Sequence, residues 1–285
     1  MSSAILDGVV LGLQFGILAV GFTLVYGLGG VLNLAYGQIL VTAAVVVSLL
    51  MDAGTPTAVA IGTGLLAGGV FAFILDSTLL RPVYRRRGEA KVLLSLLLTL
   101  GVASIVDGLL LWRYPTRALS IHIGGGTVDI LGIPMRAGSL LASGIALATF
   151  LMLFGFLRWT LRGKAVRSII QDEEGARLVG IDPGRMRTLV LVLSGVLAGL
   201  VALTRSMTSP VTVTQGISFT IFALIVTVVG GLGSVAGAFL AGILLGIVNT
   251  VSSFYIGTFL TYIIILGVAA LTILIRPSGL LGVPE

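Results

Sequence analysis

The chain has 285 residues, of which 57% are hydrophobic and only 10% are charged. Soluble domains carry about a quarter charged residues, so this chain cannot surround a core with a solvated surface, and we predict a membrane protein. It has no cysteine, which excludes a disulfide framework and a cysteine metal site. The net charge of +6 does not indicate nucleic-acid binding, because the basic residues lie in loops that flank apolar segments.

The apolar segments predict an all-α, polytopic transmembrane bundle that forms a single domain over residues 1–285. About 20 apolar residues are needed to cross the hydrocarbon core. The predicted spans, in chain order, are residues 8–28, 34–51, 55–80, 92–112, 139–157, 185–203, 217–250 and 257–275. Residues 217–250 are too long for one ordinary span, so eight or nine crossings are expected. No basic residue precedes the first span, and we expect no removable signal peptide.

Two glycine-rich breaks, near residues 27–37 and 230–237, interrupt the apolar pattern. The stretches Gly27-Leu28-Gly29-Gly30-Val31 and Gly231-Leu232-Gly233-Ser234-Val235 resemble each other and are followed by small residues. Broken helices at corresponding places in two halves indicate a substrate pathway near the membrane midplane. Close helix packing is the alternative, because glycine is frequent at helix interfaces in membranes.

Uncharged polar residues near these breaks are candidates to line a path for a neutral or zwitterionic solute. Each could equally form a hydrogen bond between packed helices. The candidates are Gln14, Thr23, Tyr26, Asn33, Tyr36, Gln38, Thr227, Ser234 and Asn249.

The basic residues predict the orientation in the membrane. Thirteen of the seventeen lie between residues 81 and 91, between residues 158 and 187, or at Arg276. Such an excess marks the cytoplasmic face, so the C-terminus is expected there. Three crossings before Arg81 would place the N-terminus outside, unless the second segment is re-entrant. The four basic residues on the opposite side are Arg113, Arg117, Arg136 and Arg205.

The longest polar segment, residues 158–187, is predicted to contain a helix over residues 164–179. Its apolar positions lie on one side, and Arg167, Gln171 and Glu174 lie on another. Gly180 suits a helix C-terminus, and Asp182-Pro183 suits the start of the next helix. The helix would rest on anionic lipid headgroups or dock into a partner protein. Its mixed charge, with Asp172-Glu173-Glu174 in the middle, favours the protein partner.

Residues that could support catalysis are few. Gly163-Lys164 is followed by Ala165, so no phosphate-binding loop is present and another polypeptide must handle ATP. His122 is the only histidine and is expected to be solvated in an external loop; neither a metal site nor a Ser-His-Asp triad is supported.

Asp76 and Asp107 lie near the ends of predicted spans. We expect structural roles, with Asp76 paired with Arg81 and Asp107 paired with Arg113. Acidic residues inside membranes are functional candidates, so a proton relay or an intramembrane aspartyl protease are alternatives. Asp107-Gly108 lacks the preceding Gly-x-Gly that would strengthen the protease interpretation.

Several separated motifs, in the same order and over nearly the whole length, resemble the permease subunits of branched-chain amino acid ABC importers. That family also includes urea and short-amide permeases. The motifs are Tyr26-Gly27, Asn33-Leu34-Ala35-Tyr36-Gly37-Gln38, Arg81-Pro82, residues 164–182, Gly230-Gly231-Leu232-Gly233-Ser234 with Gly237-Ala238, and Arg276-Pro277-Ser278-Gly279-Leu280-Leu281-Gly282.

The stretch Glu174-Gly175-Ala176-Arg177-Leu178-Val179-Gly180 is similar to the Glu-Ala-Ala-three-residues-Gly signature of ABC importer permeases. The resemblance implies that residues 158–187 form the coupling loop, which docks into the ATPase. The contact residues it implies are Arg167, Gln171, Glu174, Ala176 and Gly180. Gly175 replaces an alanine of the signature and weakens the helix by about 1 kcal/mol.

The resemblance further implies a permease in the bacterial inner membrane that moves branched-chain amino acids or a related small polar solute. The expected partners are two ATPase subunits that carry ATP and magnesium, a second homologous permease, a solute-binding protein and membrane lipid. The chain itself would bind no cofactor and perform no covalent chemistry. Tyr36 stands where the family usually has histidine, and Leu34 replaces a phenylalanine, which leaves the substrate open. The alternative function is a secondary transporter driven by an ion gradient through Asp76 and Asp107.

Overall fold

The computed structural model describes residues 2–86, 88–121, 126–130, 133–276 and 278–282. His122, Pro277 and Arg87, one of the basic residues between 81 and 91, lie outside the described residues. Within the described part, eight helical segments are long and apolar enough to cross a membrane, and the helix of residues 36–52 is a shorter apolar one. The prediction of an all-α polytopic bundle with eight or nine crossings is therefore confirmed.

The helices and strands follow one another along the chain with short connections. In order they are α1 (Ser2–Gly29), α2 (Tyr36–Asp52), α3 (Thr57–Leu75), the π-helical turn η1 (Asp76–Leu80), α4 (Arg81–Val83), α5 (Glu89–Arg113), β1 (Ala118–Leu119), β2 (Thr127–Ile130), β3 (Ile133–Arg136), α6 (Ala137–Trp159), α7 (Leu161–Gln171), α8 (Glu173–Leu178), α9 (Pro183–Ser206), β4 (Val211–Thr212), the 3-10 turn η2 (Val213–Gln215), α10 (Gly216–Gly230), α11 (Val235–Ile256) and α12 (Thr258–Ile275).

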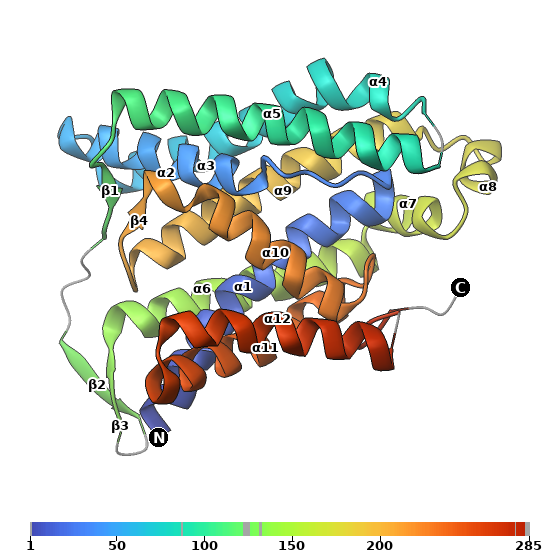
Figure 1. The fold of residues 1–285 in the computed structure, drawn as a ribbon. Coiled ribbons are helices and arrows are strands. Elements are labelled where there is room, and N and C mark those ends of the chain that lie inside the picture. The colour runs from blue at the N-terminus through green and yellow to red at the C-terminus, as the bar shows by residue number, and fades with distance from the viewer. Residues whose placement is uncertain (1, 87, 122–125, 131–132, 277, 283–285) are drawn as a thin grey trace.

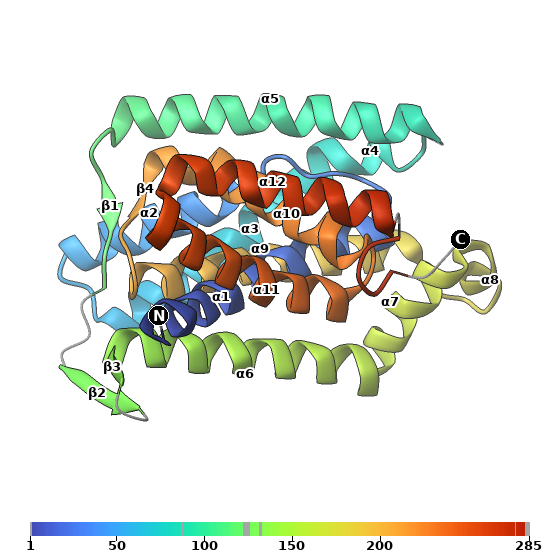
Figure 2. The same cartoon turned by 60° about the horizontal axis from the view of Figure 1, so that its bottom comes forward.

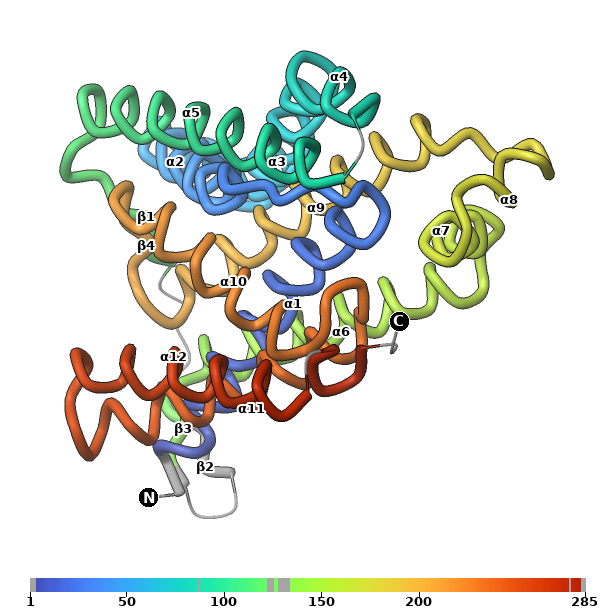
Figure 3. The backbone as a smooth tube through the Cα atoms, turned by 45° about the vertical axis from the view of Figure 1, so that its right-hand side comes forward, coloured from blue at the N-terminus to red at the C-terminus, as the bar shows by residue number. Residues whose placement is uncertain are grey.

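The bundle is built around α1, which packs against α6, α9, α10 and α11 (Figures 1 and 2). In the most apolar 18 residues of each helix, 89% of the residues are buried in α1 but only 17% are buried in α5 and in α12. Figure 3 shows α11 and α12 on one flank of the bundle and α2, α3 and α5 on the other. The outer faces of α5 and α12 are apolar and exposed, as expected of surfaces covered by lipid or by another membrane subunit.

Glycines allow α1 and α11 to approach closely. A Cβ atom added to Gly246 would lie 2.2 Å from the Cα atom of Gly12, and one added to Gly242 would lie 2.3 Å from that of Gly16. Glycines four residues apart on both helices thus form the small-residue interface that membrane helices use for backbone contact. Part of the glycine content therefore serves packing.

The chain breaks at both predicted glycine stretches, and the two breaks differ in form. After α1, residues 30–35 run back into the bundle before α2 begins (Figure 1). Between α10 and α11, Gly231 adopts a φ of 102° in a tight turn. The C-terminal segment packs on this turn, because the amide of Leu280 donates to the carbonyl of Val229 at 2.9 Å.

Short strands lie at the end of the bundle where the N-terminus is found (Figure 1). β1 pairs antiparallel with β4, and β2 pairs antiparallel with β3 in a hairpin. The β1–β4 pair ties the α5–α6 connection to the α9–α10 connection, while α7 and α8 project from the opposite end.

Candidate functional site

The polar loop of residues 158–187 folds as two helices, and the predicted single helix over residues 164–179 is wrong. Asp172 ends α7, and its Oδ1 atom accepts a hydrogen bond from the Glu174 amide at 3.0 Å at the start of α8. The amphipathic pattern continues through this point, but an aspartate side chain competes with the helix for backbone amides. The result is a sharp bend within the loop.

The predicted boundaries after this bend are confirmed. Gly180 has a φ of 86°, in the left-handed region that favours glycine at a helix end. Asp182 Oδ1 accepts from the amides of Gly184, at 2.8 Å, and Arg185, at 3.3 Å, and Pro183 is the first residue of α9. Short-range sequence preferences therefore determine how the chain re-enters the membrane domain.

The five predicted coupling residues share the loop but differ in exposure. Arg167, Gln171, Glu174 and Gly180 are exposed, whereas Ala176 is buried and anchors α8. Sequence reasoning missed two strongly exposed apolar residues at the end of α8, Leu178 at 89% exposure and Val179 at 77%. The signal was present, because two large apolar residues directly before a helix-ending glycine have no core position to fill.

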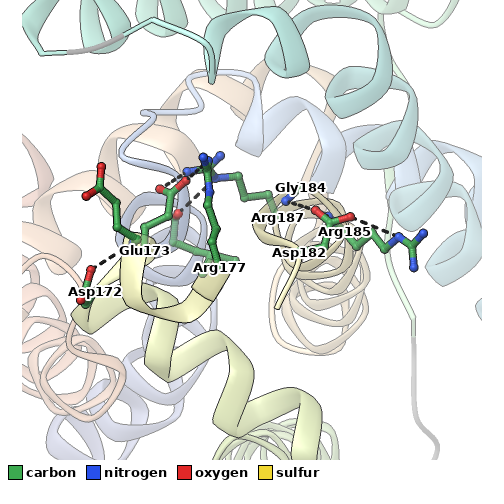
Figure 4. Close-up of polar contacts among 9 residues, drawn as sticks. Asp172, Glu173, Arg177, Asp182, Gly184, Arg185 and Arg187 are labelled. Carbon is green, nitrogen blue, oxygen red and sulfur yellow. Dashed lines mark hydrogen bonds and ion pairs between the residues drawn. The ribbon is translucent and has the colours of Figure 1, made fainter. Parts of the chain in front are cut away.

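A second feature missed from the sequence is the ion-pair cluster around Glu173 (Figure 4). Glu173 Oε1 accepts from Arg177 Nη2 at 2.6 Å, and Glu173 Oε2 accepts from Arg187 Nη2 at 2.5 Å. Arg187 is only 7% exposed, and its guanidinium lies 4.7 Å above the ring of Tyr84. Its Nε atom donates to the carbonyl of Leu28 at 3.4 Å, at the end of α1. Arg187 thus joins α8 to α9, to α1 and to the segment after α4.

These residues line a charged cleft of about 1040 Å³ between the segment after α4 and the loop from α8 to α9. Arginine and lysine side chains outnumber carboxylates on its walls. Burial and the nearby Asp76 carboxylate raise the pKa of Tyr84 far above its ordinary value, so the Tyr84 hydroxyl remains neutral beneath the guanidinium.

Asp76 lies in the π-helical turn beside this cleft and is fully buried. Its Oδ2 atom accepts from Thr188 Oγ1 at 2.5 Å and lies 3.7 Å from Arg81 Nε. The predicted pairing with Arg81 is confirmed. The carboxylate therefore ties η1 to α9, next to Arg187 in the sequence.

The first glycine break contains an extended segment inside the bundle whose backbone is satisfied by side chains. The amide of Leu34 donates to Thr99 Oγ1 at 2.9 Å, and the amide of Gly37 donates to Thr220 Oγ1 at 2.9 Å. The amide of Leu32 donates to Ser95 Oγ at 3.2 Å. An unwound segment is tolerated at membrane depth only where neighbouring helices supply such partners. Sequence reasoning missed these hydroxyl residues of α5 and α10.

A hydrogen bond of Tyr36 shows how far along the bundle the extended segment ends. Its hydroxyl donates to the carbonyl of Ser194 at 3.2 Å, and Ser194 lies midway along α9. The start of α2 is therefore far from both ends of α9. Asn33 and Gln38 lie in the same region: Asn33 Oδ1 accepts from the Ala35 amide at 3.0 Å, and Gln38 Nε2 donates to Asp107 Oδ1 at 3.3 Å.

The predicted pair of Asp107 with Arg113 is wrong for the part of the chain that the structure describes. Asp107 lies on the face of α5 that meets α2, so Gln38 reaches it instead. The two residues are six positions apart on α5, which places them on different faces of that helix.

The remaining pathway candidates are dispersed. Thr227 Oγ1 donates to the carbonyl of Ala19 at 3.1 Å and accepts from Thr23 Oγ1 at 3.1 Å, so this pair joins α10 to α1. Ser234 caps the start of α11, and Tyr26 is half-buried. Gln14 lies apart, at a cavity near the opposite end of the bundle. The structure brings together only the group around the start of α2.

Comparison with known proteins gives a consistent result. The model of the family described as "branched-chain amino acid transport system / permease component" matches residues 4–274. The high-affinity branched-chain amino acid transport system permease protein LivH of Escherichia coli K12 is 26% identical, covering 98% of this chain and 94% of the relative. BraD of Pseudomonas aeruginosa, described as a permease of the same kind, is 26% identical over 99% of this chain and 95% of its own.

The chain is also similar to a sugar permease and to a solved structure. The L-arabinose ABC transporter permease protein AraH of Azospirillum brasilense is 28% identical over 91% of this chain and 75% of its own. The solved structure of PsaBC from Streptococcus pneumoniae in complex with Fab superposes with a TM-score of 0.52 at 14% identity, covering 95% of this chain and 91% of that one, which shows a shared fold. With the family model matched over almost the entire chain, this protein belongs to the branched-chain amino acid transport system permease components.

Proposed function

We propose that this chain is the permease subunit of an ATP-binding-cassette importer for branched-chain amino acids or a related small polar solute. The observation that carries the proposal is the loop of α7 and α8. It projects from one end of the bundle, exposes Leu178 and Val179, and is anchored to the interior by Arg187. Exposed apolar residues beside charged ones suit a docking partner.

In this mechanism the partner is an ATPase that binds ATP and magnesium, while this chain binds no cofactor and performs no covalent chemistry. A displacement of α8 is passed through Glu173 to Arg187, and from there to the end of α1 and to α9. The extended segment of residues 30–35 follows α1 directly, so it moves with that end. Alternating access then requires no large rearrangement of the packed core.

Further partners follow from the exposed surfaces and from the family. The outer faces of α5 and α12 suit lipid and a second, homologous permease subunit. A solute-binding protein would deliver substrate to the face opposite α7 and α8. The loop and the C-terminus would lie in the cytoplasm of a bacterial cell and the N-terminus outside the inner membrane, because the basic residues cluster at the loop end.

The test is reconstitution in proteoliposomes with a candidate ATPase subunit and a candidate solute-binding protein from the same organism. We expect the binding protein and its ligand together to stimulate ATP hydrolysis, and uptake to stop when the ATPase is inactivated. The secondary-transport alternative predicts that uptake survives ATPase inactivation and collapses with the proton gradient. Replacing Asp76 and Asp107 by asparagine tests the same point, since a proton-coupled carrier would lose its ion dependence.

A further inference from the structure

A cavity of about 400 Å³ lies at the end of the bundle opposite the coupling loop. Its walls come from α1, β3, α9 and α11 and include Asp7, Leu11, Gln14, Met135, Arg136 and Arg205. Ligand pockets in proteins range from roughly 300 to 1,000 Å³, so this volume suits a small molecule. Arg205 lies eleven residues beyond Ser194 on α9, about 16 Å along the helix, which separates the cavity from the unwound segment near Tyr36.

Three charged side chains face the cavity without an ion-pair partner among the described residues: Asp7, Arg136 and Arg205. Arg205 is half-buried, and the side-chain hydrogen bond found for it runs from Nη1 to the neutral hydroxyl of Thr208 at 3.3 Å. A guanidinium withdrawn from water is stabilised best by a carboxylate. A carboxylate such as Asp7 can in turn receive an ammonium group.

The side chain of Gln14 lines the cavity and is held in place by hydrogen bonds. Gln14 is fully buried, and its Nε2 atom donates to the carbonyl of Thr204 at 3.2 Å and to Thr208 Oγ1 at 3.5 Å. Its Oε1 atom has no hydrogen-bond partner in the described part of the chain. Such a buried acceptor costs free energy until a donor reaches it. Because Thr208 contacts both Gln14 and Arg205, the amide and the guanidinium are held together.

Apolar side chains supply the rest of the wall. Val10 and Met135 are almost fully buried, and Leu11 is partly buried beside them. Opposite charges next to an apolar wall match a ligand that carries a carboxylate, an ammonium and a hydrocarbon group.

We propose that this cavity is a binding site for a small zwitterion with an apolar side chain, that is, an α-amino acid. Arg205, assisted by Arg136, binds the carboxylate, Asp7 binds the ammonium, and Leu11 with Met135 contacts the side chain. The site lies on the face to which solute would be delivered. The delivery of solute to this face and the choice of L-leucine as the probe rest on the proposed function, while the site itself rests on the charges and the cavity.

The experiment measures equilibrium binding of radiolabelled L-leucine to the full chain in lipid nanodiscs, without its partners. Competition with 4-methylpentanoate, which lacks the ammonium, and 3-methylbutylamine, which lacks the carboxylate, reports each charge separately. We expect both competitors to bind at least about tenfold more weakly than L-leucine. Arg205→Gln should bind L-leucine no more tightly than the wild-type chain binds 3-methylbutylamine. Asp7→Asn should bind L-leucine no more tightly than the wild-type chain binds 4-methylpentanoate. Arg113→Gln, an exposed arginine at the end of α5, is the matched control and should bind as wild type.

Absence of saturable L-leucine binding, or unchanged selectivity in both variants, would overturn the proposal. If Arg205→Gln does not yield folded protein, the exposed Asp7 carries the test alone, and wild-type selectivity in Asp7→Asn is then decisive. A third result would also overturn the proposal: the wild-type chain binds no L-leucine, and Arg205→Gln or Asp7→Asn weakens docking of the solute-binding protein. The cavity would then receive a side chain of that partner. Failure of the proposed importer function gives a different result, namely L-leucine binding without stimulated ATP hydrolysis in the complex.

Discussion

The substitution Arg187→Gln tests whether the coupling loop transmits movement through a single buried arginine. It removes the 2.5 Å bond to Glu173, the 3.4 Å bond to the Leu28 carbonyl and the stacking 4.7 Å above Tyr84. A hydrogen bond between charged groups contributes about 1.5–3 kcal/mol, and only the bond to Glu173 anchors α8. Glu173 keeps its bond to Arg177 and is 32% exposed, so solvent screening reduces the loss. We expect α8 to lose about 2 kcal/mol of anchoring.

A loss of about 2 kcal/mol shifts the ratio of anchored to detached α8 by roughly 30-fold. Proteoliposomes that contain the complete transporter measure the effect as solute taken up per ATP hydrolysed. We expect this ratio to fall in Arg187→Gln while the ATPase remains bound and hydrolyses ATP. Arg185→Gln is the matched control, because Arg185 is 85% exposed and, in the part of the chain that the structure describes, forms its ion pair with Asp182 at 3.2 Å.

The charge-reversed pair Glu173→Arg with Arg187→Glu should recover part of the coupling, which a purely structural loss would not allow. Uptake per ATP equal to wild type in Arg187→Gln would refute the reasoning. A fall of equal size in Arg185→Gln would also refute it, since the effect would then follow surface charge rather than the buried anchor.

Three further substitutions test separate parts of the structure. Leu178→Ser changes an 89% exposed side chain, so the unfolding temperature should stay the same while less ATPase co-purifies with the chain. An equal loss of ATPase in Leu161→Ser, a residue of α7 that is 84% exposed, would contradict a specific contact at Leu178. Gly246→Leu places a Cβ atom 2.2 Å from a backbone atom of α1 and should destabilise the protein by about 1–3 kcal/mol in thermal unfolding. Gly267→Leu is the control and should not, because a Cβ atom there meets no other described part of the bundle within 4 Å. Thr99→Val leaves the Leu34 amide without its acceptor at 2.9 Å, which should lower the free energy of unfolding by about 1–3 kcal/mol and reduce uptake. Thr63→Val, which removes an exposed hydroxyl bonded within its own helix, is the control, and an equal effect there would argue against a role for the unwound segment.

Local features of this protein were predictable because they depend on neighbouring residues. Hydropathy over about 20 residues decides whether a segment enters lipid, so the spans followed from composition. The start of α9 followed from Asp182-Pro183, and the loop end followed from Gly180. The sequence did not predict the bend at Asp172, because the amphipathic pattern of the loop favours one continuous helix. The hydrogen bond from the Glu174 amide to the Asp172 side chain divides the loop into two helices.

Features that join distant segments were not predictable from one sequence. Glu173 and Arg187 were each assigned to a basic loop, but their pairing depends on how α8 folds against α9 and Tyr84. The partners of residues 30–35 lie on α5 and α10, between 63 and 186 positions away along the chain. The cavity of Asp7 and Arg205 brings the beginning of α1 to the end of α9.

The sequence by itself determined that this protein spans the membrane many times, where its polar loop lies and where its helices break. Those properties come from transfer free energies and backbone preferences, which act over one or two helical turns. Only the tertiary structure decided which arginine anchors α8, which hydroxyls satisfy the unwound backbone and which charges share a cavity. These depend on helix packing, because in lipid a side chain gains its partners from whichever helix lies beside it.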